Sequence, residues 1–205
     1  EVSGPLGDPS YREWANDICD SGQHLLELIN EILDHAKAEA GKLTLQEEDV
    51  DLLKAVDFCT RMLEPRAKRA GLSLSSTVAA EARFIRGDEK RLRQILLNLI
   101  SNAVKFSPEG GTVSLGAQQR GAWVRIWVRD QGPGIAPEFH ARIFQKFSQA
   151  DSSDTRQKGG TGLGLAISKE LIEHMHGRIG FDSEPGHGAC FWCELPLAPA
   201  ATDQP

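Results

Sequence analysis

DEKRLRQILLNLISNAVKF, residues 88–106, is the stretch that decides the fold. At 100° per residue its apolar side chains occupy most of the circumference of a helix, which predicts a helix that is largely buried. The remaining sector is polar and consists of Arg91, Gln94, Asn98, Ser101, Asn102 and Lys105. Buried polar groups need hydrogen-bonding partners, so this sector is either a solvated face or a binding site.

Three residues of the polar sector indicate what such a site would bind. Asn98, Asn102 and Lys105 lie at i, i+4 and i+7, one above another on the helix. Amide oxygens suit Mg²⁺ or its water ligands, and an ammonium group supplies positive charge. The stripe therefore suits a magnesium-bound polyphosphate, and the helix alone leaves the solvated face open as the alternative.

Two glycine-rich stretches follow. GGTGLGLAIS (159–168) has four glycines in six positions before an apolar helix, where free backbone amides can bind phosphate. A flexible hinge is the alternative. In RDQGPGIAP (129–137), Asp130 stands at the end of a predicted strand and can accept a hydrogen bond from an amine such as that of adenine. A simple turn is the alternative there.

The rest of the chain predicts an α+β fold, with helices laid on one face of a sheet. Helical periodicity covers residues 11–40, 53–70, 88–106 and 163–176. Strands are predicted around residues 43–52, 72–75, 82–86, 112–117, 122–129, 178–182 and 189–197.

Composition excludes several classes of protein. A net charge of −6 provides no electrostatic footprint for nucleic acid. The sequence also has no run of 18 apolar residues, so it predicts no membrane-spanning helix. A Rossmann site and a P-loop need glycine spacings that this chain lacks.

The four cysteines predict a reduced, cytoplasmic protein; they are Cys19, Cys59, Cys190 and Cys193. Cys190 and Cys193 would face opposite sides of a strand, which favours core cysteines over a zinc site.

Five segments, in their order along the chain, resemble the N, first glycine, F, second glycine and third glycine boxes of sensor histidine kinases. They are NLISNAVKF (98–106), DQGPGI (130–135), FQKF (144–147), GGTGLGLAI (159–167) and SEPGHG (183–188). The resemblance implies a Bergerat-type α/β-sandwich ATP-binding domain over residues 43–197, with a mixed sheet. Residues 1–42 resemble the loop and second helix of the family's dimerisation and histidine-phosphotransfer domain, and residues 198–205 would be a frayed tail.

The resemblance also implies an ATP site with Mg²⁺. Asn102 would coordinate Mg²⁺, with Asn98 and Lys105 near the phosphates. Phe106 would lie beside the adenine, and Asp130 would bind its amino group. The other implied contacts come from the glycine loops and from a mobile ATP lid over residues 136–160: Gly132, Gly134, Ile135, Phe144, Lys146, Phe147, Gly160, Thr161, Gly162, Leu163, Gly164 and Leu165.

The implied function is that of a bacterial two-component histidine kinase. It would transfer the γ-phosphate of ATP to a histidine on a first dimerisation helix, absent from this chain, for onward transfer to a response-regulator aspartate. The implied partners are ATP, dimerisation helices of a homodimer and a response regulator, with no nucleic acid and no membrane contact by this segment. The full-length protein could still be membrane-anchored. A nucleotide-gated interaction module with little kinase activity is the alternative.

Two absences sharpen these expectations. Gyrase-type relatives place a glutamate base one helical turn before the metal asparagine, where this chain has Asn98, so only slow ATP hydrolysis is predicted. None of the six histidines stands in a box resembling H-E-L-R-T-P-L, and His24 comes closest. We therefore expect the fragment to bind ATP without phosphorylating itself.

Overall fold

The computed structural model describes residues 44–148 and 162–199, together with five separate residues near the start of the chain. The chain divides into two compact units, residues 1–43 and 44–205. In the first unit the described residues are all helical and exposed: Tyr11, Trp14, Ala15, Ile18 and Gly22. The other residues of the helix predicted over 11–40 lie outside the described ones.

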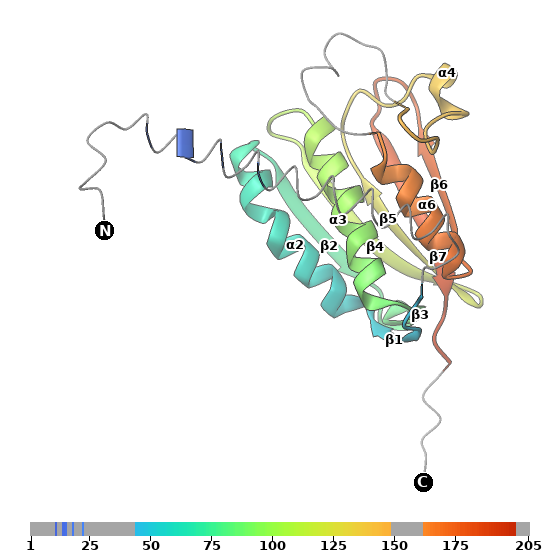
Figure 1. Cartoon of the computed structure of the whole chain (residues 1–205). Coiled ribbons are helices and arrows are strands. Elements are labelled where there is room, and N and C mark those ends of the chain that lie inside the picture. Colours follow the sequence, from blue (N-terminus) through green and yellow to red (C-terminus); the bar gives the residue numbers. More distant parts are fainter. Residues whose placement is uncertain are drawn as a thin grey trace. The chain divides into compact units, whose positions relative to one another are not determined.

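A five-stranded mixed sheet forms the second unit, in the order β2-β4-β5-β7-β6 (Figure 1). The strands are β2 (Ser73–Val78), β4 (Thr112–Arg120), β5 (Trp123–Arg129), β7 (Ala189–Pro196) and β6 (Arg178–Ser183). β2 pairs with β4 in parallel, and the other neighbouring strands are antiparallel. β1 (Glu48–Asp51) and β3 (Phe84–Gly87) form a separate antiparallel pair.

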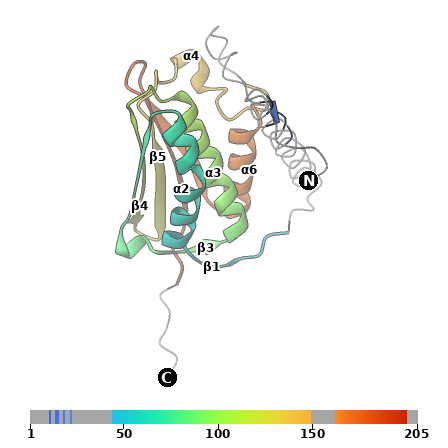
Figure 2. The ribbon, with the colours of Figure 1, turned by 90° about the vertical axis from the view of Figure 1, so that its left-hand side faces the viewer.

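Three helices cover one face of this sheet (Figure 2): α2 (Leu52–Arg69), α3 (Glu89–Phe106) and α6 (Gly164–His174). The core between helices and sheet is aliphatic. Its largest fully buried side chains are Leu52, Ile85, Leu92, Ile95, Leu96, Leu99, Ile100, Ile126, Leu171, Ile172, Met175 and Leu195. The predicted α+β class, with a mixed sheet and helices on one face, is confirmed.

α3 begins where its sequence predicts. The Asp88 carboxylate accepts hydrogen bonds from the Arg91 and Gln46 backbone N–H groups, at 3.0 and 2.9 Å, and so caps the helix. Leu92, Ile95 and the other apolar residues pack into the core, so helical geometry leaves the polar sector along one edge of that core.

In the described part of the second unit no helix covers the opposite face of the sheet, and side chains of the strands cover it instead. The Trp127 ring lies on Gly116 and the Trp192 ring on Gly180, so closely that a Cβ at either glycine would lie 2.0 or 2.3 Å from the indole. Arg125 stacks over Trp192, with its guanidinium carbon 4.1 Å from the ring centre. This cross-strand packing protects a face that has no second layer.

Some predicted boundaries are wrong. The strand expected over residues 82–86 begins two residues later, as β3, after a 3₁₀ turn at Ala80–Ala82. Ala198, which we assigned to the frayed tail, is buried, and its N–H donates to the Phe84 carbonyl at 3.1 Å. No helix in the described part of the chain is long and apolar enough to cross a membrane.

Candidate functional site

The polar sector of α3 is organised by two side-chain hydrogen bonds. Asn98 Nδ2 donates to Ser168 Oγ of α6 at 2.8 Å, and Asn102 Nδ2 donates to Asn98 Oδ1 at 3.3 Å. All three residues are buried or half-buried. Among the described residues, no group donates to the Asn102 carboxamide oxygen. That oxygen is therefore available to a cation, and Mg²⁺ prefers oxygen ligands.

The other polar residues of α3 divide between two surroundings. Ser101 Oγ accepts a hydrogen bond from Arg66 of α2 at 2.9 Å, so Ser101 belongs to the α2–α3 interface. Lys105 Nζ lies 4.9 Å from the centre of the Phe106 ring at the end of the helix. Asn98, Asn102 and Lys105 thus share one edge of α3, as their spacing predicts, whereas Ser101 does not join them.

Asp130 follows β5 and is 7% exposed. Its Oδ1 accepts hydrogen bonds from the backbone N–H groups of Gly132, at 2.8 Å, and Ala189, at 3.1 Å. Burial raises the pKa of the Asp130 carboxyl, and these two hydrogen bonds act in the opposite direction. Within the described ranges Oδ2 has no such donor. One oxygen is thus fixed by the backbone and the other can accept a hydrogen bond from a ligand.

Close backbone contacts bring three distant segments together. A Cβ at Gly132 would lie 2.7 Å from the Phe106 carbonyl oxygen, so the loop after β5 lies against the end of α3. A Cβ at Gly164 would lie 2.4 Å from Asn98 Oδ1, so the start of α6 lies against the middle of α3. The Asp130 loop and the start of α6 therefore both lie against α3, at Phe106 and at Asn98 respectively.

The loop after β5 is also tied to the β6–β7 turn. Ile135 N–H donates to Ser183 Oγ at 2.9 Å, and the same hydroxyl donates to the Gly188 carbonyl at 2.8 Å. Gly134 has φ +73°, and a Cβ there would lie 2.2 Å from the Glu184 carbonyl oxygen. These contacts fix the loop after β5 against the β6–β7 turn. That turn leads into Ala189, whose N–H donates to Asp130 Oδ1.

α6 begins in the glycine-rich stretch. Leu163 precedes the helix and is buried, Gly164 is its first residue, and Leu165 is half-buried. Gly162 has φ +69°, and its carbonyl accepts a hydrogen bond from the Phe147 N–H at 3.0 Å. The helix start therefore lies beside Asn98, as a phosphate-binding helix N-terminus near a metal ligand would require.

Residues of the predicted lid take different positions. Phe144 packs against Phe181 and Phe191 of the sheet, with ring centres 6.0 and 6.4 Å apart. Phe147 is 73% exposed. In this structure Phe144, rather than Phe147, anchors the segment to the sheet.

One residue of the predicted lid forms an ion pair with α6. Lys146 Nζ lies 3.5 Å from Glu170 Oε1, so this lysine extends toward α6. A short helix, α4 (Pro137–His140), starts the segment. Gly160 and Thr161, two of the predicted phosphate contacts, lie outside the described residues, as do all residues from 149 to 161.

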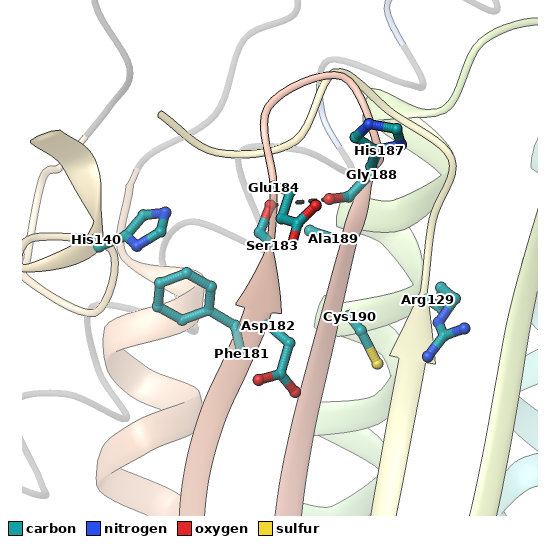
Figure 3. Close-up of a pocket in the computed structure, with 10 residues that line it drawn as sticks. All are labelled: Arg129, His140, Phe181, Asp182, Ser183, Glu184, His187, Gly188, Ala189 and Cys190. Carbon is teal, nitrogen blue, oxygen red and sulfur yellow. Dashed lines mark hydrogen bonds between the residues drawn. The ribbon is translucent and has the colours of Figure 1, made fainter. Parts of the chain in front are cut away.

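A pocket of about 540 Å³ opens at the ends of β6 and β7 (Figure 3). Side chains from both sides of the β6–β7 hairpin line it, including Arg129, His140, Phe181, Asp182 and Cys190. Of its lining residues, Gly188 and Ala189 also contact Asp130 or its loop. The pocket thus borders the Asp130 loop, and neither Asn98, Asn102 nor Asp130 lines it.

The two cysteines of β7 differ. Cys193 is fully buried, which raises its pKa to about 12. Cys190 lies on the opposite side of the strand, is half-buried and lines the pocket of Figure 3. The prediction of two core cysteines therefore holds for Cys193 and is wrong for Cys190.

Sequence reasoning missed two residues of the site. Ser168 is a buried hydroxyl in an otherwise apolar helical run, and its position one turn after Gly164 was the available signal. Ala189 contributes through its backbone N–H, for which a sequence gives no signal.

The geometry agrees with a family resemblance found along the sequence. Residues 87–199 match the family described as histidine kinase-, DNA gyrase B-, and HSP90-like ATPase. The chain belongs to this family. The matched residues all lie in the second unit. The expected relationship to sensor histidine kinases is confirmed.

Individual proteins similar to this chain include sensor histidine kinases. The sensor protein GacS of Pseudomonas syringae pv. syringae is 44% identical over 96% of this chain and 22% of its own length. The circadian input-output histidine kinase CikA of Synechococcus elongatus is 44% identical over 94% of this chain and 26% of its own length. The structure of full-length ShkA in complex with AMPPNP superposes with a TM-score of 0.80 and 40% identity, over 95% of this chain and 40% of ShkA.

The chain spans about a quarter of the length of the curated relatives it matches. These comparisons identify the second unit as an ATP-binding catalytic domain of the sensor histidine kinase type. They give no support to the alternative of an interaction module without kinase activity.

Proposed function

We propose that the second unit binds Mg·ATP between α3, the loop after β5 and the start of α6, and donates the γ-phosphate to a histidine of a dimerisation helix. The observation that carries this proposal is Asp130, a buried carboxylate with one oxygen held by two backbone amides and the other open. Oδ2 accepts a hydrogen bond from the adenine amino group, and Phe106 lies beside the ring.

The phosphates lie at the other end of the site. The Asn102 oxygen holds Mg²⁺, which neutralises charge on the phosphates when bound. Lys105 and the backbone N–H groups at the start of α6 bind the phosphate oxygens. Within the described ranges no group of three His, Cys, Asp or Glu side chains is placed to hold a metal ion.

Asn98 explains why the phosphate goes to a protein acceptor. Its amide is engaged by Ser168 and Asn102, and an amide cannot take a proton from water. Phosphoryl transfer depends mainly on positioning and charge stabilisation. We therefore expect the site to hydrolyse ATP only slowly and to transfer the phosphate when an acceptor histidine approaches.

The wider context follows from the same proposal. Residues 1–42 supply the second helix of a dimerisation domain, the full protein is a homodimer, and a response regulator receives the phosphate. The need for ATP and the free thiols of Cys59, Cys190 and Cys193 support a reducing, cytoplasmic location. ShkA, solved with AMPPNP, supports the nucleotide assignment.

Replacing Asn102 by alanine tests the metal ligand. We expect binding of a fluorescent ATP analogue to weaken about 10-fold to 100-fold in Mg²⁺, and to change little in EDTA, because only the cation contact is lost. Ser101→Ala is the matched control, since Ser101 is on the same helix but contacts α2. Equal weakening in both solutions, or a large loss of thermal stability without ligand, would mark Asn102 as structural.

Phosphotransfer is tested with γ-labelled ATP. We expect no label on this chain alone, because none of its six histidines stands in an acceptor box. Adding a complete dimerisation domain with its acceptor histidine, taken from a sensor histidine kinase, should give acid-labile label on that domain. Acid-labile label on His24 or another histidine of this chain would contradict the prediction, and failure to label any competent acceptor would contradict the kinase assignment.

A further inference from the structure

We propose that Ser168 is a positioning residue for the Asn102 carboxamide and acts through Asn98. The inference rests on the proposed Mg·ATP site and assigns a role to a side chain outside the boxes that carry the resemblance. Its basis is a chain of two hydrogen bonds that runs from α6 into α3.

Ser168 is 2% exposed and lies among the apolar residues that α6 buries, Ala166, Ile167, Leu171 and Ile172. Burying a hydroxyl is costly unless it forms a hydrogen bond, and alanine would fill this position at lower cost. The hydroxyl accepts a hydrogen bond from Asn98 Nδ2, at 2.8 Å. The hydroxyl therefore serves Asn98 rather than the packing of the helix.

Asn98 is held from two sides by residues one helical turn apart on α6. Ser168 binds its amide nitrogen, and Gly164 leaves room for its oxygen, since a Cβ at Gly164 would lie 2.4 Å from Oδ1. With its nitrogen on Ser168, the planar carboxamide of Asn98 directs its oxygen to the other side. Oδ1 therefore points at the Asn102 amide.

The position of Asn98 sets the orientation of Asn102. Because an amide oxygen accepts hydrogen bonds and cannot donate them, Asn98 Oδ1 selects the Asn102 nitrogen, at 3.3 Å. The Asn102 oxygen is then directed away from Asn98, toward the proposed cation. Residues behind a metal ligand orient it in this way in metal sites generally.

The arrangement couples the two ends of the phosphate site. The helix that carries Ser168 also begins at Gly164, after Leu163, where we propose that backbone N–H groups bind the phosphates. A shift of α6 would move the phosphate-binding amides and the support of the metal ligand together. Ser168 thus links Mg²⁺ binding to the position of α6.

The test compares dissociation constants of a fluorescent ATP analogue in Mg²⁺ and in EDTA. Their ratio measures how much the cation strengthens binding. Ser168→Ala is expected to reduce this ratio about 10-fold, with binding in EDTA unchanged. Ser168→Thr keeps the hydroxyl and Ser168→Val has nearly the same shape without it, so the threonine variant should retain the ratio and the valine variant should lose it.

Each outcome decides the matter. An unchanged ratio in Ser168→Ala, or equal ratios in the threonine and valine variants, overturns the role of Ser168 and leaves the Mg·ATP site standing if the unaltered protein still needs Mg²⁺. If the unaltered protein binds the analogue equally with and without Mg²⁺, the proposed site fails and the inference with it. Should Ser168→Ala prove unfolded by thermal melting, the threonine–valine pair gives the answer.

Discussion

Asp130→Asn is expected to abolish the preference for ATP over GTP. The retained Oδ1 still accepts from Gly132 and Ala189, but an NH₂ group replaces Oδ2 and meets the adenine amino group donor to donor. Guanine presents a carbonyl oxygen at that position, which the NH₂ group can bind. We expect ATP affinity to fall about 10-fold to 100-fold relative to GTP, measured by competition against the fluorescent analogue.

The same substitution has a stability signature. Burial raises the pKa of Asp130 above its ordinary value of 3.8, so the folded domain holds this proton more tightly than the unfolded chain does. Asp130 thus lowers stability progressively as pH rises from its unfolded pKa through its folded pKa, and the cost is complete once the pH exceeds the folded pKa. The empty Asp130→Asn domain should therefore melt at a higher temperature than the unaltered protein at pH 7, and at a similar temperature near pH 3.

Two results would count against this account. An unchanged ATP preference in Asp130→Asn and in Asp130→Ala would exclude the contact with the adenine amino group. A lower melting temperature of Asp130→Asn at pH 7 would mean that the asparagine does not keep the two backbone hydrogen bonds.

Gly134→Ala is expected to cause the second large effect, a loss of about 3 kcal/mol in the free energy of unfolding together with weaker ATP binding. Gly134 has φ +73°, and the added Cβ would lie 2.2 Å from the Glu184 carbonyl oxygen and 3.2 Å from Pro185 Cα. Both are main-chain atoms, so no side-chain rotation relieves the contact. The loop after β5 must then move away from the β6–β7 turn.

Gly186→Ala is the matched control. Gly186 has φ +84° in the neighbouring turn, but a Cβ there meets nothing within 4 Å. It bears the backbone strain without the contact, and we expect a loss of about 1–2 kcal/mol by chemical denaturation. Equal losses in the two variants would attribute the effect at Gly134 to its backbone angle alone.

Much of the fold follows from local patterns in the sequence. The periodicity of residues 88–106 predicts a buried helix with one polar edge, and Asp88 predicts its start, because both depend on residues close in sequence. The pairing of β1 with β3 could not be predicted. These strands have four residues each, and Asp51 meets Phe84 only through contacts between distant parts of the chain.

The site is predictable to a smaller extent. The chemistry of the single residues does not decide whether Asn102 belongs to a solvated face or a binding site, or whether Asp130 belongs to a turn or a binding site. Only the order of the five motifs assigns both residues to one ATP site. In the sequence Ser168 is one residue of a mainly apolar helix. Its contact with Asn98 is seen only in the structure. The lid contacts, including those of Lys146 and Phe147, stay predictions, because they depend on how the segment arranges around a nucleotide.

The hydrogen bond from Phe147 N–H to the Gly162 carbonyl, 3.0 Å long, has a consequence for how this domain can change. It joins two points of the chain, 15 residues apart in sequence, through main-chain atoms alone. Doubling the number of residues between two joined points costs only about 0.6 kcal/mol in closure entropy. A change in the number of residues between Phe147 and Gly162 is therefore expected to cost this contact itself little free energy.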